Sequence, residues 1–283
     1  MKIPSRIEIT SFPQGKRIAV TISFDDGHTF DRRIVESFNK WGLKATFNLN
    51  SRALGRTGIP PPHGKRNHLD ASEVAALFRG HEVAIHTVSH PRLSRLDPSQ
   101  IAYEVLEDRK ALEDLVGYPV RGMAYPFGDY DQRVIEVLRA LGIVYCRCSE
   151  KAVKCFPPVE PLAWPTTAHQ YATTPTVPER FEEMCKNERY TGVLYTYGHG
   201  FEFHDKDDWG ALERIYKPLS RNPDTWYCTN IELFDYEAAR NRLVIAANRA
   251  SAFNPSGISV TLKADGKLID VPGGQTVSLA EAD

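Results

Sequence analysis

The sequence predicts an α/β protein whose parallel strands close into a barrel. Short apolar runs rich in β-branched residues alternate with amphipathic segments whose apolar side chains recur at helical spacing. This alternation is typical of βαβ units on a parallel sheet. About seven or eight such units follow one another, which favours a closed barrel over an open sheet.

The first unit shows how the elements are assigned. The β-branched run at 17–24 predicts a strand that stops at Asp25-Asp26-Gly27, where a turn is expected. The helix predicted at 31–41 carries an apolar face and ends at Gly42. By the same criteria, the later strands lie at 45–49, 81–85, 122–125, 143–146 and 192–197. The later helices are amphipathic segments at 70–78, 98–116, 132–141, 178–187, 209–219 and 231–241.

Residues 51–68 form a long loop that is rich in Gly, Pro, Arg and His. Its cationic side chains, Arg52, Arg56, Lys65 and Arg66, could touch an anionic substrate. A solvated loop is the simpler interpretation of the same residues.

The last 40 or so residues change character. A strand, an Asp-Gly turn and a second strand are expected at 260–269, and a third strand at 276–279 follows a Pro-Gly-Gly turn. We therefore expect a barrel over 1–240 and a small C-terminal β extension over 241–283. The extension could form an oligomer contact, form a rim of the substrate cleft or simply stabilise the barrel.

Composition excludes several classes of protein. Of the 283 residues, 35 are Lys or Arg and 36 are Asp or Glu, so the net charge of −1 offers no excess to neutralise nucleic-acid phosphates. It favours a neutral or weakly charged substrate. No apolar run approaches the roughly 20 residues that span a bilayer, so no membrane association is expected. The N-terminus leads into no apolar signal core, which predicts a cytoplasmic protein, although a processed exported protein would look the same.

Candidate functional residues follow the predicted strands. Asp25 and Asp26, His86, Phe127 and His199 each come just after an apolar strand. Because the carboxyl ends of barrel strands share one face, these residues are expected to converge.

Two histidines and a carboxylate indicate a metal site. His86 and His90 are four residues apart and would share one face of a helical turn. With Asp26 they form a two-His, one-carboxylate set that leaves positions open for water and substrate. The simpler alternatives are a surface histidine pair and an ordinary Asp-Asp-Gly turn.

Four motifs occur in this order: Ser23-Phe24-Asp25-Asp26-Gly27, His86-Thr87-Val88-Ser89-His90, Ala124-Tyr125-Pro126-Phe127-Gly128 and Gly198-His199. Together they resemble the polysaccharide deacetylases, carbohydrate esterase family four, over residues about 15 to about 240. The resemblance implies a distorted, incomplete (β/α)7-type barrel. It also implies a metal-dependent hydrolase that removes acetyl groups from N- or O-acetylated oligo- or polysaccharides.

The resemblance assigns a role to each motif. Asp26, His86 and His90 would hold a divalent ion, most often Zn²⁺, with Co²⁺ or Ni²⁺ as alternatives. Asp25 would be the general base toward the attacking water, and His199 the general acid toward the leaving group.

Aromatic residues near the motifs are expected to meet the substrate. The backbone N–H of Phe127, where the family usually carries Tyr, would help to bind the oxyanion. Tyr125 and Trp164 could line a groove for the sugar, although packing at the barrel rim would also explain them.

Two positions depart from the family pattern. The Arg that usually orients the base is replaced by Ala124, and the second acid of a later motif is replaced by Ala163, while Glu160 keeps the first. His28 and Glu202 are the residues that could substitute.

Two other interpretations stay open at this point. The same superfamily resemblance covers hydrolases of cyclic amides and other small amide metabolites. The missing Arg and acid would also fit a sugar-binding pseudo-enzyme. A homo-oligomer is compatible with either interpretation.

Overall fold

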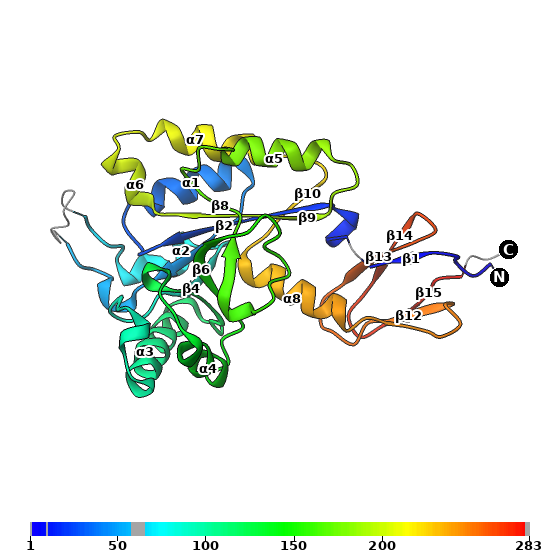
Figure 1. The fold of residues 1–283 in the computed structure, drawn as a ribbon, viewed down its shortest axis with the longest axis horizontal. Helices are drawn as coiled ribbons and strands as arrows, with labels where there is room; N and C mark the ends of the chain where they lie inside the picture. Colours follow the sequence, from blue (N-terminus) through cyan, green and yellow to red (C-terminus); the bar gives the residue numbers. More distant parts are fainter. Residues whose placement is uncertain (1, 10, 58–65, 281–283) are drawn as a thin grey trace.

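The predicted strands assemble into a parallel barrel in the computed structural model, which describes residues 2–9, 11–57 and 66–280 (Figure 1). The barrel strands, in chain order, are β2 (Ile18–Asp25), β3 (Thr46–Leu49), β4 (Glu82–Ile85), β5 (Gly122–Ala124), β6 (Tyr145–Lys151), β7 (Trp164–Thr166), β8 (Ala168–His169) and β9 (Gly192–Gly198). They are ordered β7-β6-β5-β4-β3-β2-β9-β8, and neighbours in this order are parallel.

The barrel closes through a short segment that the sequence patterns did not predict as strand. β7 pairs with β6, and β8 pairs with β9. Only Thr167 separates the two strands, and its N–H donates to the carbonyl of Tyr195 at 2.8 Å. The closed barrel confirms the predicted fold class.

The barrel is distorted at β2. One edge of this strand pairs with β9 over residues 18–24. Along the other edge, β10 (Thr225–Tyr227) pairs with residues 18–20, whereas β3 pairs with residues 23–25. All eight residues of β2 are buried, as expected for a parallel strand covered on both faces.

Helices cover the barrel on two sides: in Figure 1, α1, α5 and α7 lie on one side, and α3 and α4 on the other. The α-helices are α1 (Asp31–Trp41), α2 (Val74–Leu77), α3 (Pro98–Val116), α4 (Gln132–Ala140), α5 (Val177–Lys186), α6 (Gly200–Asp205), α7 (Gly210–Tyr216) and α8 (Asn230–Asn241). Single 3-10 turns occur at Pro13–Gly15, Ser51–Ala53, Ala71–Glu73, Leu93–Arg95, Pro126–Gly128, Pro161–Ala163 and Lys217–Leu219. The helix predicted at 70–78 is thus a 3-10 turn followed by one short α-helix. Among the described residues, no helix combines the length and apolar character that a bilayer span needs.

The start of α8 closes the end of the barrel where the strands begin. Asn230 is fully buried, and its side chain accepts a hydrogen bond from Thr21 Oγ1 and donates one to Tyr195 Oη, each at 2.7 Å. The N–H of Ile231 donates to buried Glu82 at 2.9 Å.

A small β unit lies at the same end of the barrel. It contains β13 (Val260–Ala264), β14 (Lys267–Val271), β11 (Val244–Ile245), β12 (Ser251–Phe253), β15 (Thr276–Ser278) and the N-terminal β1 (Ile7–Glu8). β1 pairs with β13, so both ends of the chain contribute to this unit. The expected hairpin at 260–269 is present as β13 and β14. The domain boundary at residue 240 stays a prediction. Figure 1 places the β unit at one end of the barrel and the carboxyl ends of the strands at the other, so it does not form a rim of the site.

Candidate active site

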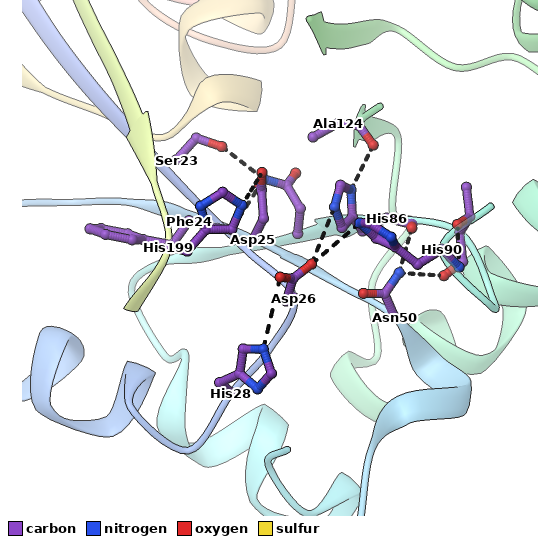
Figure 2. A network of polar contacts seen from close by, with 12 residues as sticks. Ser23, Phe24, Asp25, Asp26, His28, Asn50, His86, His90, Ala124 and His199 are labelled. Atoms are coloured by element: carbon purple, nitrogen blue, oxygen red, sulfur yellow. Dashed lines mark hydrogen bonds and ion pairs between the residues drawn. The ribbon is translucent and has the colours of Figure 1, made fainter. Parts of the chain in front are cut away.

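The residues that follow the strands converge at the carboxyl end of the barrel. Asp25 ends β2, His86 follows β4, and His199 follows β9. Figure 2 shows Asp26 between His28 on one side and the pair of His86 and His90 on the other. The convergence expected from barrel geometry is therefore present.

Asp26, His86 and His90 form a group that can hold a metal ion. Oδ1 of Asp26 lies 3.5 Å from Nε2 of His86 and 3.5 Å from Nε2 of His90. One ligand atom from each of the three residues lies within 4.8 Å of the others. Burial by itself raises the pKa of Asp26, but the neighbouring histidines outweigh it and lower the pKa to about 2.

The two histidines meet through a loop, and the expected helical turn is wrong. Thr87 and His90 have positive φ angles of 69° and 58°. In a helix the carbonyl of Thr87 would accept a hydrogen bond from the N–H of residue 91, but that residue is Pro91, which has no N–H. The side chain of Asn50 donates instead to the carbonyls of His86 and Thr87, at 2.5 and 2.9 Å.

His86 is held in the form that a metal ligand needs. Its Nδ1–H donates to the carbonyl of Ala124 at 2.8 Å, which leaves the Nε2 lone pair facing Asp26. Burial lowers the pKa of His86 to about 4, so the ring is neutral. Two imidazole nitrogens and one carboxylate oxygen suit a divalent transition ion, and the residues present therefore fit the implied metal.

Asp25 is buried and ionised beside this group. Asn48 Nδ2 donates to its Oδ1 at 2.8 Å, and the Arg147 guanidinium donates to its Oδ2. Burial by itself raises the pKa of Asp25, but Arg147, with smaller contributions from His86 and His199, lowers it below its usual value. Asp25 is thus a carboxylate that can accept a proton at neutral pH.

Arg147 was missed by the sequence analysis. It lies on β6 and is the register partner of Ala124 on β5, so a guanidinium reaches Asp25 from the neighbouring strand. Its side chain is only 2% exposed. Arg147 directly follows the predicted strand at 143–146 and lies between the buried residues Cys146 and Cys148. This position was the signal, because a buried Arg is almost always paired.

His199 faces Asp25 on one side and Glu202 on the other. Its Nε2 lies 3.8 Å from Asp25 Oδ2, and its Nδ1 lies 3.2 Å from Glu202 Oε1. Burial by itself lowers the pKa of His199, but the hydrogen bond to Glu202 and the charges of Asp26 and Asp25 raise it to about 9. The ring is therefore protonated at neutral pH and can act as a general acid.

Two further residues hold Glu202 in place. Nε2 of His169 lies 3.3 Å from Glu202 Oε1, and Gln170 Nε2 donates to Glu202 Oε2. Gln170 also donates to the carbonyl of His199 at 3.0 Å. His169, His199 and Glu202 are close enough to share a cation as well. Both supporting residues come from the closing segment at β8, so they were not predicted.

The remaining predicted residues divide into two groups. Phe127 is 56% exposed, has a φ of 60° and packs edge-on against His90 with ring centroids 4.6 Å apart. His28 Nε2 lies 3.8 Å from Asp26 Oδ2. Phe127 and His28, like Glu202, therefore adjoin the site.

Tyr125, Trp164 and Glu160 are not part of the cluster. Tyr125 is buried, and its hydroxyl donates to the carbonyl of Leu162 at 2.6 Å. Trp164 is fully buried, and its Nε1 donates to the carbonyl of Cys155 at 2.9 Å. Glu160 pairs with Arg139 at 2.6 Å. Tyr125 and Trp164 are core residues, because their polar atoms bond to backbone inside the protein; the expectation that they contact substrate is corrected.

Comparison with known proteins supports the resemblance found in the motifs. Residues 13–146 match the family model described as polysaccharide deacetylase. The chain is 28% identical over 139 residues to the peptidoglycan-N-acetylglucosamine deacetylase of Listeria monocytogenes, covering 47% of this chain and 27% of the relative. It is 28% identical over 124 residues to chitin deacetylase 1 of Cryptococcus neoformans, covering 43% and 24%. It thus spans about a quarter of the length of these relatives.

The fold also matches solved structures. The Xyl-CE4 domain of a multidomain xylanase from the hindgut metagenome of Trinervitermes trinervoides superposes with a TM-score of 0.52. The superposition covers 78% of this chain and 91% of that domain at 18% sequence identity. The barrel is therefore shared well beyond the segment that the family model matches.

Proposed function

From the match of residues 13–146 to the polysaccharide deacetylase family model, we infer that the chain is a metal-dependent hydrolase of acetylated carbohydrate. The reaction would remove an acetyl group from the nitrogen or oxygen of a sugar in an oligo- or polysaccharide. Zn²⁺ is the ion we favour, with Co²⁺ or Ni²⁺ as alternatives, because the donor set contains two imidazoles and one carboxylate.

One observation carries this proposal. A group able to hold a metal, a buried carboxylate and a protonated histidine share one end of the barrel. Asp25 and His199 differ in protonation because their environments shift their pKa values apart, which is the arrangement that acid–base catalysis requires. A sugar-binding pseudo-enzyme would not need this pair.

The chain's own residues can carry out the proton transfers. A divalent ion held by Asp26, His86 and His90 would polarise the acetyl carbonyl and make water more acidic. Asp25 accepts the proton of the attacking water, and Arg147 holds the carboxylate in place for that step. His199 donates its proton to the leaving amine or alkoxide.

The oxyanion that develops in the reaction needs a hydrogen-bond donor as well. The negative charge of the tetrahedral intermediate would be met by the backbone N–H of Phe127, whose left-handed conformation lies next to His90.

The proposal is tested by acetate release from N-acetylglucosamine oligomers and from an O-acetylated xylan oligomer. We expect release that a chelator abolishes and that added zinc, cobalt or nickel restores. The Asp25→Asn variant should bind metal but release no acetate above background. A protein that binds no divalent ion, or an Asp25→Asn variant with unchanged activity, would contradict the proposal. Hydrolysis of cyclic amides without acetate from any sugar would point to the amidase alternative.

A further inference from the structure

We propose that the pocket beside Asp26, His86 and His90, the metal group, binds a negatively charged substituent of the substrate. Arg52 and Arg56 would bind that substituent. The substituent would be a carboxylate or a phosphate on the acetylated sugar or its neighbour. The proposal rests on the proposed function, because it concerns the substrate of the same site.

The pocket is continuous with the metal group. It has a volume of about 420 Å³, and its wall includes Asp26 and His90. Arg52, Arg56 and His68 line it as well. A sugar whose acetyl group lay at the metal group would thus have a neighbouring substituent within reach of the two arginines. The volume is within the usual range for small-molecule sites.

The two arginines have no acidic partner among the residues that the structure describes. Asp26 is the only carboxylate in the described lining, and it belongs to the metal group. Neither Arg52 nor Arg56 forms an ion pair with another described residue, and residues 58–65 contain no Asp or Glu. By contrast, Arg66 of the same loop is paired with Asp205. Arginines without a partner beside a substrate pocket are suited to bind carboxylate or phosphate.

A second observation points to a polar ligand. His68 lines the pocket, and its buried Nδ1 has no hydrogen-bond partner among the described residues. The ring of His28, which is 6% exposed and also lines the pocket, lies 4.3 Å from the His68 ring. Buried polar atoms without partners are rare in folded proteins, and a bound polar group often explains them.

A second hollow that adjoins this pocket has a different lining. It is lined by Ser89, Leu96, Gln100, Tyr103 and Glu104, and Ser89 belongs to the walls of both hollows. Among its described lining residues are a carboxylate and no arginine or lysine, and Tyr103 is 59% exposed. An exposed aromatic ring suits a neutral sugar face. The substrate is therefore expected to place its charged part toward Arg52 and its neutral part toward Tyr103.

This local charge changes the expectation drawn from composition. The chain as a whole is nearly neutral, which favours a neutral substrate. The pocket concentrates positive charge in one place, and a divalent ion at the metal group would increase it. Local fields of this kind select substrates even when net charge does not, and salt weakens them.

The test compares three sugars that differ in charge. Acetate release is measured from N-acetylglucosamine, N-acetylmuramic acid and N-acetylglucosamine 6-phosphate, each with the zinc-loaded protein at low and high salt. We expect kcat/KM to be on the order of tenfold higher for at least one acidic sugar, with a smaller preference at high salt. Which acidic sugar is preferred separates the carboxylate from the phosphate.

Variants assign the preference to the pocket. The Arg52→Gln/Arg56→Gln protein should lose the preference, because its kcat/KM falls more for the acidic sugar than for N-acetylglucosamine. Arg79→Gln is the matched control, because Arg79 is exposed and precedes β4 at the opposite end of the barrel. Equal kcat/KM for neutral and acidic sugars, or an equal loss for all sugars in the double variant, would overturn the proposal.

A binding measurement gives a readout that does not need turnover. Calorimetry with the Asp25→Asn protein should show tighter binding of an acidic sugar than of N-acetylglucosamine, and the two arginine substitutions should remove the difference. Equal affinities would contradict the pocket proposal. Preferential binding of an acidic sugar without acetate release from any sugar by the wild type would contradict the proposed function and leave the pocket proposal supported.

Discussion

The Asp25 carboxylate owes its ionised state to a cation that comes from β6, a strand that does not pair with β2. Ala124 stands where the resemblance leads one to expect an orienting Arg, and Arg147 is its register partner on β6. The guanidinium therefore approaches Asp25 from nearly the same level along the barrel as a side chain at position 124 would. A single sequence does not reveal this, because it does not give the register of two strands.

The first prediction concerns this relocated cation. Arg147→Ala should lower kcat by roughly 10- to 100-fold, since residues that orient catalytic groups typically have effects of this size. It should also lower stability, because Asp25 would be left buried without its partner. The Ala124→Arg/Arg147→Ala double variant should recover part of the lost kcat. A folded double variant that is no more active than Arg147→Ala would contradict this account.

The second prediction concerns the acid. Because the raised pKa of His199, about 9, lies above neutral pH, the protonated form that donates is present below that value and is lost as the pH rises through it. The hydrogen bond to Glu202 is the largest influence that raises this pKa. Glu202→Gln should therefore move the alkaline limb of the kcat–pH profile down by about one unit or more.

Glu160→Gln is the matched control for this experiment. Glu160 is also an acid near a motif, but it pairs with Arg139 away from the site. Its substitution should leave the alkaline limb where it is. If both variants had the same profile as the wild type, Glu202 would not set the protonation of His199.

At the scale of the element, the closing segment from β7 to β8 provides both core and site residues. Trp164 on β7 is buried against Tyr195, with ring centroids 4.2 Å apart, whereas His169 on β8 reaches Glu202. The segment was not predicted as strand because it is short and contains Pro165. The longer strands and helices were predictable because burial on one or both faces imposes a regular pattern.

The third prediction distinguishes a core role for Trp164 from a role in the substrate groove. Trp164→Phe removes the hydrogen bond to the carbonyl of Cys155 and leaves a smaller ring in a fully buried space. The free energy of unfolding should fall by about 1–3 kcal/mol, while KM stays unchanged. Denaturant unfolding and steady-state kinetics measure the two quantities. A rise in KM with unchanged stability would instead place Trp164 in the groove.

The fourth prediction concerns the junction of α8 with the barrel. Glu82 is buried and accepts hydrogen bonds from Thr46 Oγ1, Ile231 N–H and Tyr145 Oη. Burial raises its pKa from 4.5 to about 7. The folded state therefore holds the proton more tightly than the unfolded state, and the associated stability is complete below about pH 4.5 and lost as the pH rises through about 7.

Glu82→Gln isolates this effect, because the amide stays neutral at every pH. Between about pH 5 and about pH 8, the free energy of unfolding of the wild type should fall relative to the variant by about 2 kcal/mol. Urea unfolding at several pH values provides the comparison. A difference between the two proteins that does not change with pH would contradict the raised pKa.

At the scale of the whole molecule, one end of the barrel is covered by other elements and the opposite end carries the candidate active site. The strands begin at the end where α8 and the small β unit pack, and they finish at the end that holds the metal group (Figure 1). The alternation of strands and helices predicted this convergence of Asp25, Asp26, His86 and His199. It did not predict that β1 joins the C-terminal strands, because a two-residue pairing leaves no pattern in the sequence.

The central claim is that the Asp26, His86 and His90 group holds the ion on which hydrolysis depends. The most direct measurement is acetate release from N-acetylated oligosaccharide by the chelated protein as zinc is added back, with bound zinc determined in parallel. We predict that activity rises with the first equivalent of zinc, and that His90→Ala loses both the bound zinc and the activity. Full acetate release by zinc-free protein, or activity and zinc content unchanged in His90→Ala, would contradict the claim.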